Sequence, residues 1–404
     1  MKFQQTDSRA GRFVKQPSGY HAFIPAPLPP DPPIAMDSEI QRLLSDADRA
    51  LGRLDGITTV LPNPDLFVAM YVRQEAVLSS QIEGTQSTME DILHYEVEAG
   101  GDHLPKDVSE VSNYVKAINY GLQRLKDFPL SLRLIREIHE QLLEGVRGQH
   151  QKPGEFRKSQ NWIGPGGCTL ADAVFIPPPP SELIPALSDL EGFLHSTSDL
   201  PALIHCGLAH AQFETIHPFL DGNGRVGRLL ITFLLCERNI LQRPLLYLSH
   251  YFKLHRVEYY DRLMATRMSG DWEGWLKFFL RGVFEVSLEA ANTSRSIIQL
   301  REEHQSLIRN AFGSSPGMAL ELLDHLFFFP VTTPRRAESL LKCSYVTASK
   351  LIRQMESHGL LQETTGGQRN RVYHYQPYLD LFLLREEGPQ SEDGEESEVQ
   401  ATEN

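Results

Sequence analysis

The chain has 404 residues, of which 41% are hydrophobic and 23% charged, a balance typical of a soluble globular protein with two or three domains. It has no apolar run near the roughly 18 residues that span a bilayer, and its start, MKFQQTDSRAGRF, lacks an apolar signal core, so we expect a cytoplasmic protein without membrane contact. The net charge of −13 argues against a chain-wide nucleic-acid surface, and the four cysteines form no CxxC pair, so we expect reduced core thiols.

The N-terminal part predicts an arm followed by helices. Residues 16–36 contain seven prolines, which predicts an extended arm rather than a helix or strand. Apolar residues then recur at helical spacing over 38–54 and 63–82. The tetrapeptide STME predicts the next helix, with Ser87 as N-cap and Glu90 completing a capping box. Glu83 and Gly84 therefore lie in a tight junction between two helices, with Gly84 as C-cap.

The central part predicts one β-hairpin among helices. The segments EFRKSQNWIG and CTLADAVFIPPPP alternate in polarity around GPGG, which predicts a hairpin over 155–180. Helical spacing predicts the remaining central elements, at 109–125, 131–145, 181–196, 201–214, 226–238, 258–268 and 272–309.

The C-terminal part predicts a winged helix-turn-helix followed by a disordered tail. Three short helical patterns precede two strand-like pieces around Gly-Gly, which is the order of a winged helix. Residues 385–404 contain eight acids and one base and no aromatic residue, so we expect disorder. The predicted divisions are an arm at 1–36, a helical region at 37–130, a central core at 131–312, a winged helix at 313–384 and a tail at 385–404.

The stretch HPFLDGNGRVGR, at 217–228, carries the most chemistry. Two glycines and an asparagine predict a turn, and the apolar run after it predicts a helix. The amides of the GNG segment then lie at a helix N-terminus, where unpaired donors and the helix dipole favour an anion. Arg225 and Arg228 add positive charge at the same end, which is unfavourable unless something negative binds there. A polyphosphate satisfies all of these features.

Two further side chains in this stretch suit transfer of a phosphorus-containing group. His217 can accept a proton at neutral pH. Asp221, beside a phosphate site, suits Mg²⁺, which prefers a carboxylate together with phosphate oxygens and water. Each residue alone would more often be structural, but their order makes a purely structural role a poor explanation.

The stretch HPFLDGNGRVGR resembles the signature of the Fic family, HxFx(D/E)GNGRxxR, at every defined position. The resemblance implies a mainly α-helical Fic core with a β-hairpin flap, and transfer of AMP from ATP to a hydroxyl side chain of a target protein, with release of pyrophosphate. By the same resemblance His217 is the base and Asp221 holds Mg²⁺. The implied ATP contacts are Glu83, Gly222, Asn223, Gly224, Arg225, Val226, Gly227, Arg228 and Tyr260, with Arg228 at the γ-phosphate. The hairpin would clamp an extended target segment.

The segment SSQIEGT, at 79–85, resembles the inhibitory pattern (S/T)xxxE(G/N) of this family, with Ser79, Glu83 and Gly84 at its defined positions. The resemblance implies that Glu83 pairs with Arg228 and blocks the productive pose of ATP. A carboxylate at the end of a helix is otherwise unfavourable, and a cation would remove that cost.

Several alternatives stay open. Glu83 could align a water that removes AMP from proteins, and another nucleotide could be the donor. The winged helix could make the protein a DNA-binding regulator, because 332–373 carries seven Lys/Arg and three Asp/Glu, although protein interaction or dimerisation suits it equally. The side chains expected at DNA are Thr347, Ser349, Lys350, Arg353, Arg369 and Arg371. Self-AMPylation and homodimerisation are likewise open.

Overall fold

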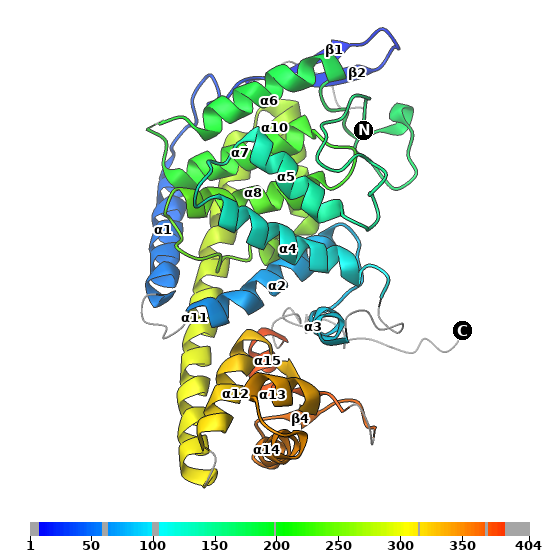
Figure 1. The fold of residues 1–404 in the computed structure, drawn as a ribbon. Coiled ribbons are helices and arrows are strands. Elements are labelled where there is room, and N and C mark those ends of the chain that lie inside the picture. Colours follow the sequence, from blue (N-terminus) through cyan, green and yellow to red (C-terminus); the bar gives the residue numbers. More distant parts are fainter. Residues whose placement is uncertain are drawn as a thin grey trace, which may run out of the picture.

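The computed structural model describes residues 8–58, 64–98, 105–197, 199–313, 316–367 and 371–383. The chain forms a larger helical body and a smaller C-terminal body, and the helix α11 (Trp272–Ala311) runs through both (Figure 1). The predicted mainly helical fold is confirmed. The predicted acidic tail lies outside the described residues.

The larger body contains most of the elements. From the N-terminus these are β1 (Gly11–Lys15), β2 (His21–Pro25), α1 (Ser38–Thr58), α2 (Pro64–Ile82), α3 (Met89–Glu98), α4 (Val108–Arg124) and α5 (Leu132–Leu143). After a short 3₁₀ turn (Leu170–Asp172) come α6 (Pro180–Leu194), α7 (Ala202–Ile216), α8 (Asn223–Glu237), α9 (Ser249–Leu254), α10 (Arg256–Ser269) and α11. The predicted helices are all present, and α9 is an addition that the helical spacing did not indicate.

The N-terminal arm was predicted to contain no strand, and this prediction was wrong at its start. β1 and β2 pair antiparallel, with Phe13 opposite Phe23. Phe23 is fully buried, and its amide donates to the carbonyl of Ile176 at 2.9 Å. The reason is the position of the prolines, because most of them follow residue 24 and leave the amides of the strand available.

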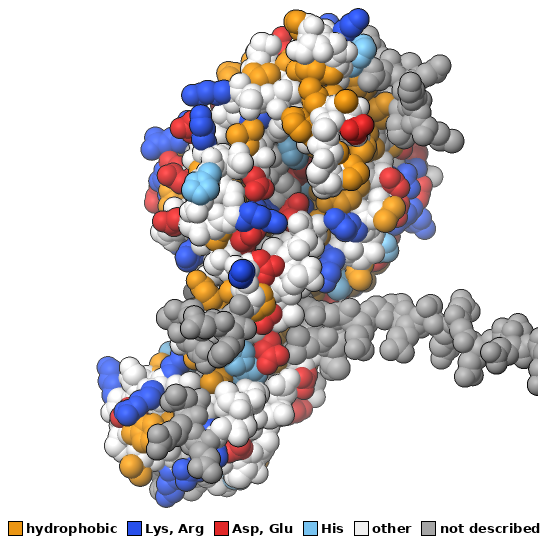
Figure 2. Space-filling view, turned by 90° about the vertical axis from the view of Figure 1, so that its right-hand side faces the viewer, with side chains coloured by type: hydrophobic (Ala, Val, Ile, Leu, Met, Phe, Trp, Pro, Cys, Tyr) orange, Lys and Arg blue, Asp and Glu red, His pale blue; other side chains and the backbone are white. Residues whose placement is uncertain are grey.

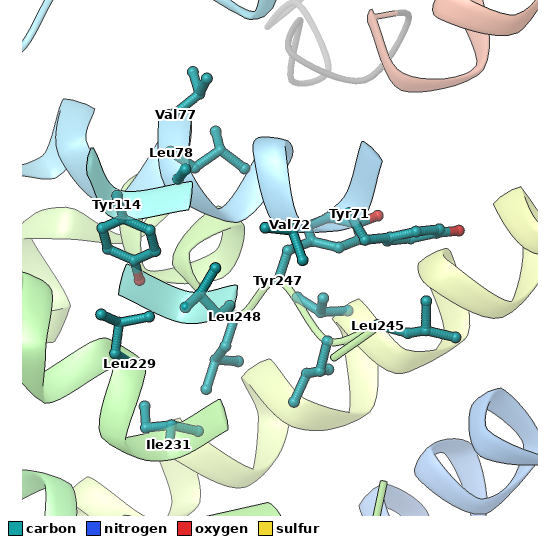
Figure 3. Close-up of a cluster of buried hydrophobic side chains, with 14 of the residues drawn as sticks. Tyr71, Val72, Val77, Leu78, Tyr114, Leu229, Ile231, Leu245, Tyr247 and Leu248 are labelled. Atoms are coloured by element: carbon teal, nitrogen blue, oxygen red, sulfur yellow. The ribbon is translucent and has the colours of Figure 1, made fainter. Parts of the chain in front are cut away.

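The helix α2 carries Ser79 at its end and is held by a buried apolar cluster (Figure 3). The cluster brings together side chains of α2, α4 and α8 with the segment before α9, namely Tyr71, Val72, Val77, Leu78, Tyr114, Leu229, Ile231, Leu245, Tyr247 and Leu248. Glu75 adds a buried polar anchor, since its carboxylate accepts hydrogen bonds from Tyr114 and Ser249. These contacts hold α2 against α8 independently of the active-site side chains.

The start of α3 differs by one residue from the prediction. Thr88 and Asp91 form the reciprocal capping bonds, with the Asp91 amide 3.2 Å from Thr88 Oγ1 and the Thr88 amide 2.8 Å from Asp91 Oδ2. The Ser87 hydroxyl instead donates to Asp107 Oδ1 at 2.5 Å. The Ser87 hydroxyl is therefore bound to Asp107, which is distant in sequence, and Thr88 caps the helix in its place.

The predicted hairpin over 155–180 folds back on itself but forms no pair of strands. A single bridge joins Ile163 and Phe175, with the Ile163 amide 2.8 Å from the Phe175 carbonyl. Arg157 and Asn161 instead donate from their side chains to the backbone carbonyl of His217. Side chains therefore anchor this segment to the end of α7.

The smaller body contains α12 (Pro316–Phe328), β3 (Val331–Thr332), α13 (Pro334–Leu341), α14 (Tyr345–Ser357), β4 (Gln362–Glu363), β5 (Tyr373–His374) and α15 (Gln376–Leu383). The strands form one sheet in the order β3-β5-β4. The winged-helix assignment and its DNA contacts stay predictions, and Arg369 lies outside the described residues. Figure 2 shows acidic side chains gathered in the band between the two bodies.

Within the described part of the chain, none of the helices has both the length and the apolar character that a membrane crossing requires.

Candidate active site

His217 lies at the C-terminal end of α7 in a left-handed backbone conformation, with φ 49° and ψ 62°. This region is sparsely populated by residues with a Cβ, and it persists only where surrounding contacts hold it. Here the carbonyl of His217 accepts from Arg157 Nε at 2.9 Å and from Asn161 Nδ2 at 3.0 Å. The predicted base is therefore held in a fixed position at the junction of α7 and the signature loop.

The imidazole of His217 is neutral at physiological pH. Burial lowers its pKa to about 3, and the nearby cations Arg267 and Arg157 act in the same direction. Its Nδ1 has no hydrogen-bond partner and lies 4.0 Å from Glu214 Oε2. A neutral ring keeps a free lone pair, which is the form that can accept a proton.

The loop between His217 and α8 is closed by its own polar groups. The Asn223 side chain accepts from the Phe219 amide at 2.8 Å and donates to the Phe219 carbonyl at 2.9 Å. Gly222 has φ 79°, a conformation that glycine adopts at little cost. Its amide donates to Asp221 Oδ1 at 2.6 Å. The asparagine of the signature thus shapes the turn that starts α8.

His139 supports this loop from α5 and was missed by the sequence analysis. Its Nδ1 accepts from the Gly154 amide at 2.9 Å, so the proton is on Nε2, which donates to the carbonyl of Asp221 at 3.0 Å. The ring stacks on Phe219 with centroids 3.7 Å apart. Burial lowers the pKa of His139 to about 4, which keeps this tautomer in place. No local motif surrounds His139, so nothing in the sequence could have indicated the role.

The N-terminus of α8 is covered by the carboxylate of Glu83. A Cβ at Gly224 would lie 2.2 Å from Glu83 Oε1, so only a glycine permits this approach. The first amides of a helix have no intrahelical acceptor, and the dipole makes this end positive. Glu83 therefore occupies the position where the sequence predicted a bound anion.

Arg228 joins the end of α2 to α8. Its Nη2 donates to Glu83 Oε1 at 2.7 Å and to the Ser79 carbonyl at 3.0 Å. Its Nε donates to Ser79 Oγ at 2.7 Å. Arg228 is 2% exposed, and a charge so buried requires this kind of pairing. Ser79, Glu83 and Arg228 are thus brought together, as the resemblance implied.

Glu83 stays ionised in this arrangement. Burial alone would raise its pKa, but the charge and hydrogen bond of Arg228, followed by the charge of Arg225, outweigh burial and lower the pKa below its ordinary value. Gly84, with φ 99°, ends the junction after α2. The side chain of Gln81 connects this junction to Lys253, whose Nζ lies 2.6 Å from Gln81 Oε1.

Arg225 pairs with acids other than Glu83. Its Nη1 donates to Glu110 Oε2 at 3.0 Å, and its Nη2 lies 3.7 Å from Asp221 Oδ1. The residue is 1% exposed, and its Nε has no partner. Glu110, from α4, is a further residue that the sequence analysis missed. The predicted contact of Arg225 with ATP stays a prediction.

The remaining signature positions lie on the inner side of α8. Val226 is buried in the core, and the carbonyl of Gly227 accepts from His210 Nδ1 at 2.8 Å. A Cβ at Gly227 would lie 2.1 Å from Glu214 Oε1. Both residues pack α8 against α7 in this structure, and their predicted contacts with ATP stay predictions.

Tyr260, on α10, lies at the rim of this group and is 38% exposed. Burial raises its pKa, and the charge of Glu83 acts in the same direction. Arg256 lies over the ring at 5.7 Å. An exposed aromatic face within electrostatic reach of Glu83 and Arg228 is compatible with the predicted adenine contact.

Replacing Glu214 with glutamine is expected to weaken the pH dependence of stability. Burial raises the pKa of Glu214 to about 7, so between its ordinary value of 4.5 and about 7 the folded chain keeps a proton that the unfolded chain has lost. Stability therefore falls as pH rises through this window, by an amount on the order of a few kcal/mol. Urea unfolding across this range should give a flatter profile for Glu214→Gln than for wild type.

The exposed Glu155 provides the matched control for this experiment. Glu155→Gln should keep the wild-type slope. A wild-type slope in Glu214→Gln would contradict the assignment.

Two consecutive regions of the chain match models of known protein families. Residues 41–123 match the model of the Fic/DOC family N-terminal region, and residues 129–235 match the Fic/DOC family model. The chain is 32% identical over 166 residues to a protein adenylyltransferase Fic of Culex quinquefasciatus, covering 41% of this chain and 29% of that protein. It is 26% identical over 177 residues to a probable protein adenylyltransferase of Aquifex aeolicus, covering 43% and 51%. The chain thus spans about half or less of the length of these relatives.

A solved structure supports the fold over most of the chain. The crystal structure of a Fic family protein from Desulfovibrio desulfuricans superposes with a TM-score of 0.55 at 18% identity and covers 85% of this chain and 97% of that one. The two matched regions contain α2 with Glu83 and α8 with the signature loop, respectively. The chain therefore matches the Fic/DOC N-terminal model over residues 41–123 and the Fic/DOC model over residues 129–235, and together these regions hold both halves of the candidate site.

Proposed function

We propose that this protein is a protein adenylyltransferase that transfers AMP from ATP to a hydroxyl side chain of a target protein, and that Glu83 restrains the reaction. The observation that carries the proposal is the position of the Glu83 carboxylate, which lies against Gly224 at the N-terminus of α8 and accepts a hydrogen bond from Arg228. A site that binds one anion there, beside a neutral imidazole, has the polarity that a triphosphate requires. The names of the similar proteins support the same reaction.

In the proposed reaction the oxygen of the target hydroxyl attacks the α-phosphorus of ATP. His217 accepts the hydroxyl proton as the new P–O bond forms. The bond between the α-phosphorus and the bridging oxygen to the β-phosphate breaks, and pyrophosphate leaves. Catalysis then depends on positioning and on charge neutralisation, which the α8 amides and Arg228 would provide.

Asp221 suits Mg²⁺ in this reaction. Its side chain is 35% exposed and lies beside the N-terminus of α8, where Oδ1 accepts a hydrogen bond from the Gly222 amide. A hard cation takes such a carboxylate together with water and phosphate oxygens. When bound, Mg²⁺ would neutralise charge on the phosphates.

The proposed restraint follows from competition for Arg228. While Arg228 binds Glu83 and Ser79, its guanidinium has few donors left for a γ-phosphate. The γ-phosphate and the Glu83 carboxylate would also repel each other at the same helix end. ATP would therefore bind in a pose that does not align the α-phosphorus for attack.

The proposal is tested with ATP labelled at different phosphates. The full chain and its Glu83→Gly variant are incubated with Mg²⁺, a host lysate and either α-labelled or γ-labelled ATP. Protein labelling from the α position but not from the γ position supports AMP transfer. Labelling from the γ position would identify a kinase, and an excess of unlabelled UTP that abolishes labelling would identify another donor.

The same labelled proteins test removal of AMP. They are isolated and returned to unlabelled wild-type protein. Release of AMP that requires Glu83 would add de-AMPylation to the function, and stable labelling would exclude it for these targets.

A further inference from the structure

A second group of chemically reactive side chains lies where the two bodies meet. Glu90 and His94 come from α3 and His374 from β5, and one donor atom of each lies within 4.8 Å of the other two. Within the described residues, this is the one group of three His, Cys, Asp or Glu side chains with donors this close. None of its members contacts His217, Asp221 or Arg228.

The two α3 residues share one face of the helix. Glu90 and His94 are four residues apart, so their side chains lie on the same face about one helical turn apart. His94 Nε2 lies 3.7 Å from Glu90 Oε1. The side chain of Glu90 is 63% exposed and that of His94 is 20% exposed, so both can adjust their rotamers. One face of α3 therefore offers an imidazole and a carboxylate together.

His374 provides the observation that points to a ligand. The residue is 3% exposed, and its Nε2 is buried without a hydrogen-bond partner. Its ring centroid lies 5.0 Å from that of His94 at an interplanar angle of 52°, so the two rings are tilted and do not stack. A buried imidazole nitrogen without a partner is costly, and such groups often mark a bound water or ion.

The surroundings hold these residues in place. Arg73 of α2 pairs with Glu96 of α3 at 2.7 Å and also donates to the carbonyl of Phe328 at 3.3 Å. β5 lies at the centre of its sheet and is paired on both sides, which fixes His374. The band between the two bodies is acidic on the face drawn in Figure 2, and such a surface attracts cations.

We propose that Glu90, His94 and His374 bind a divalent transition-metal ion of the zinc class, which cross-links α3 of the larger body to β5 of the smaller body. Two imidazoles and one carboxylate are the donors that zinc takes in proteins, whereas Mg²⁺ and Ca²⁺ prefer oxygen donors alone. A water completes the tetrahedron on the exposed side. Zn–N bonds of about 2.0–2.1 Å require the donors to approach one another, which the exposed Glu90 and His94 permit.

The test uses the full chain without a histidine tag, freed of metal by a chelator. Calorimetric titration with Zn²⁺ should show one ion bound per chain, and Co²⁺ in its place should give the intense visible bands of a tetrahedral site. His94→Gln and His374→Gln should each weaken binding by at least about tenfold, since loss of outer-shell partners alone costs that much. His325→Gln, an exposed histidine on α12, is the matched control and should bind as wild type does.

Three outcomes would overturn the proposal. Wild-type protein could show no saturable binding of Zn²⁺, both histidine variants could bind with the wild-type affinity, or the Co²⁺ spectrum could be that of an octahedral site. If His374→Gln does not fold, His94→Gln decides alone, because His94 lies nearer the surface. Zn²⁺ should also raise the thermal midpoint of wild type and of His325→Gln, and leave that of His94→Gln unchanged.

Discussion

Replacing His217 with alanine is expected to remove AMP transfer, lowering its rate by about 10²–10⁴-fold. The left-handed residue at the end of α7 places a neutral imidazole beside the signature loop, and Arg157 and Asn161 hold its carbonyl there. Alanine keeps this backbone but offers no proton acceptor. The rate is measured with α-labelled ATP in a chain that also carries Glu83→Gly, so that the restraint does not hide the loss.

The control for this prediction is His358→Ala, an exposed histidine after α14. It should label targets at the rate of the Glu83→Gly parent. Labelling by the His217→Ala chain at that same rate would show that His217 is not the base. Thermal unfolding of each variant separates lost chemistry from lost structure.

Replacing Glu83 with glycine is expected to raise AMP transfer by roughly 10–100-fold, the equivalent of a hydrogen bond to a charged group of about 1.5–3 kcal/mol. The substitution removes the carboxylate from the N-terminus of α8 and frees one of the two N–H groups of Arg228 Nη2. Arg228 keeps its bonds to Ser79, so its position should change little. The initial rate of labelling from α-labelled ATP measures the effect.

Gln86→Gly is the matched control, because Gln86 is exposed in the same junction and does not contact Arg228. Its rate should equal that of wild type. Ser79→Ala should give a smaller increase than Glu83→Gly, because it removes one bond to Arg228 and leaves the carboxylate in place. Equal rates for wild type and Glu83→Gly would remove the proposed restraint.

Local sequence patterns were sufficient to predict many of the helices. Helical spacing located α1, α2 and α11, and the Gly-Asn-Gly turn located the start of α8, because both signals depend on residues close in sequence. The errors came from distant contacts. Asp107 accepts the hydrogen bond of the Ser87 hydroxyl, which was predicted to cap α3. The carbonyl of Ile176 accepts a hydrogen bond from the amide of Phe23, in a segment predicted to contain no strand. Both acceptors are distant from their donors along the chain.

The sequence by itself determined a mainly helical protein, the turn that opens α8, and two electrostatically incomplete ends, namely the acid at Glu83 and the cation at Arg228. These follow from backbone preference and helix dipoles, which act over a few residues. Only the tertiary structure decided what completes the site, including His139 under the loop, Glu110 on Arg225 and His374 beside α3. Such partners are single polar side chains without periodicity, and they are selected by burial, where an unpaired charge or donor is costly.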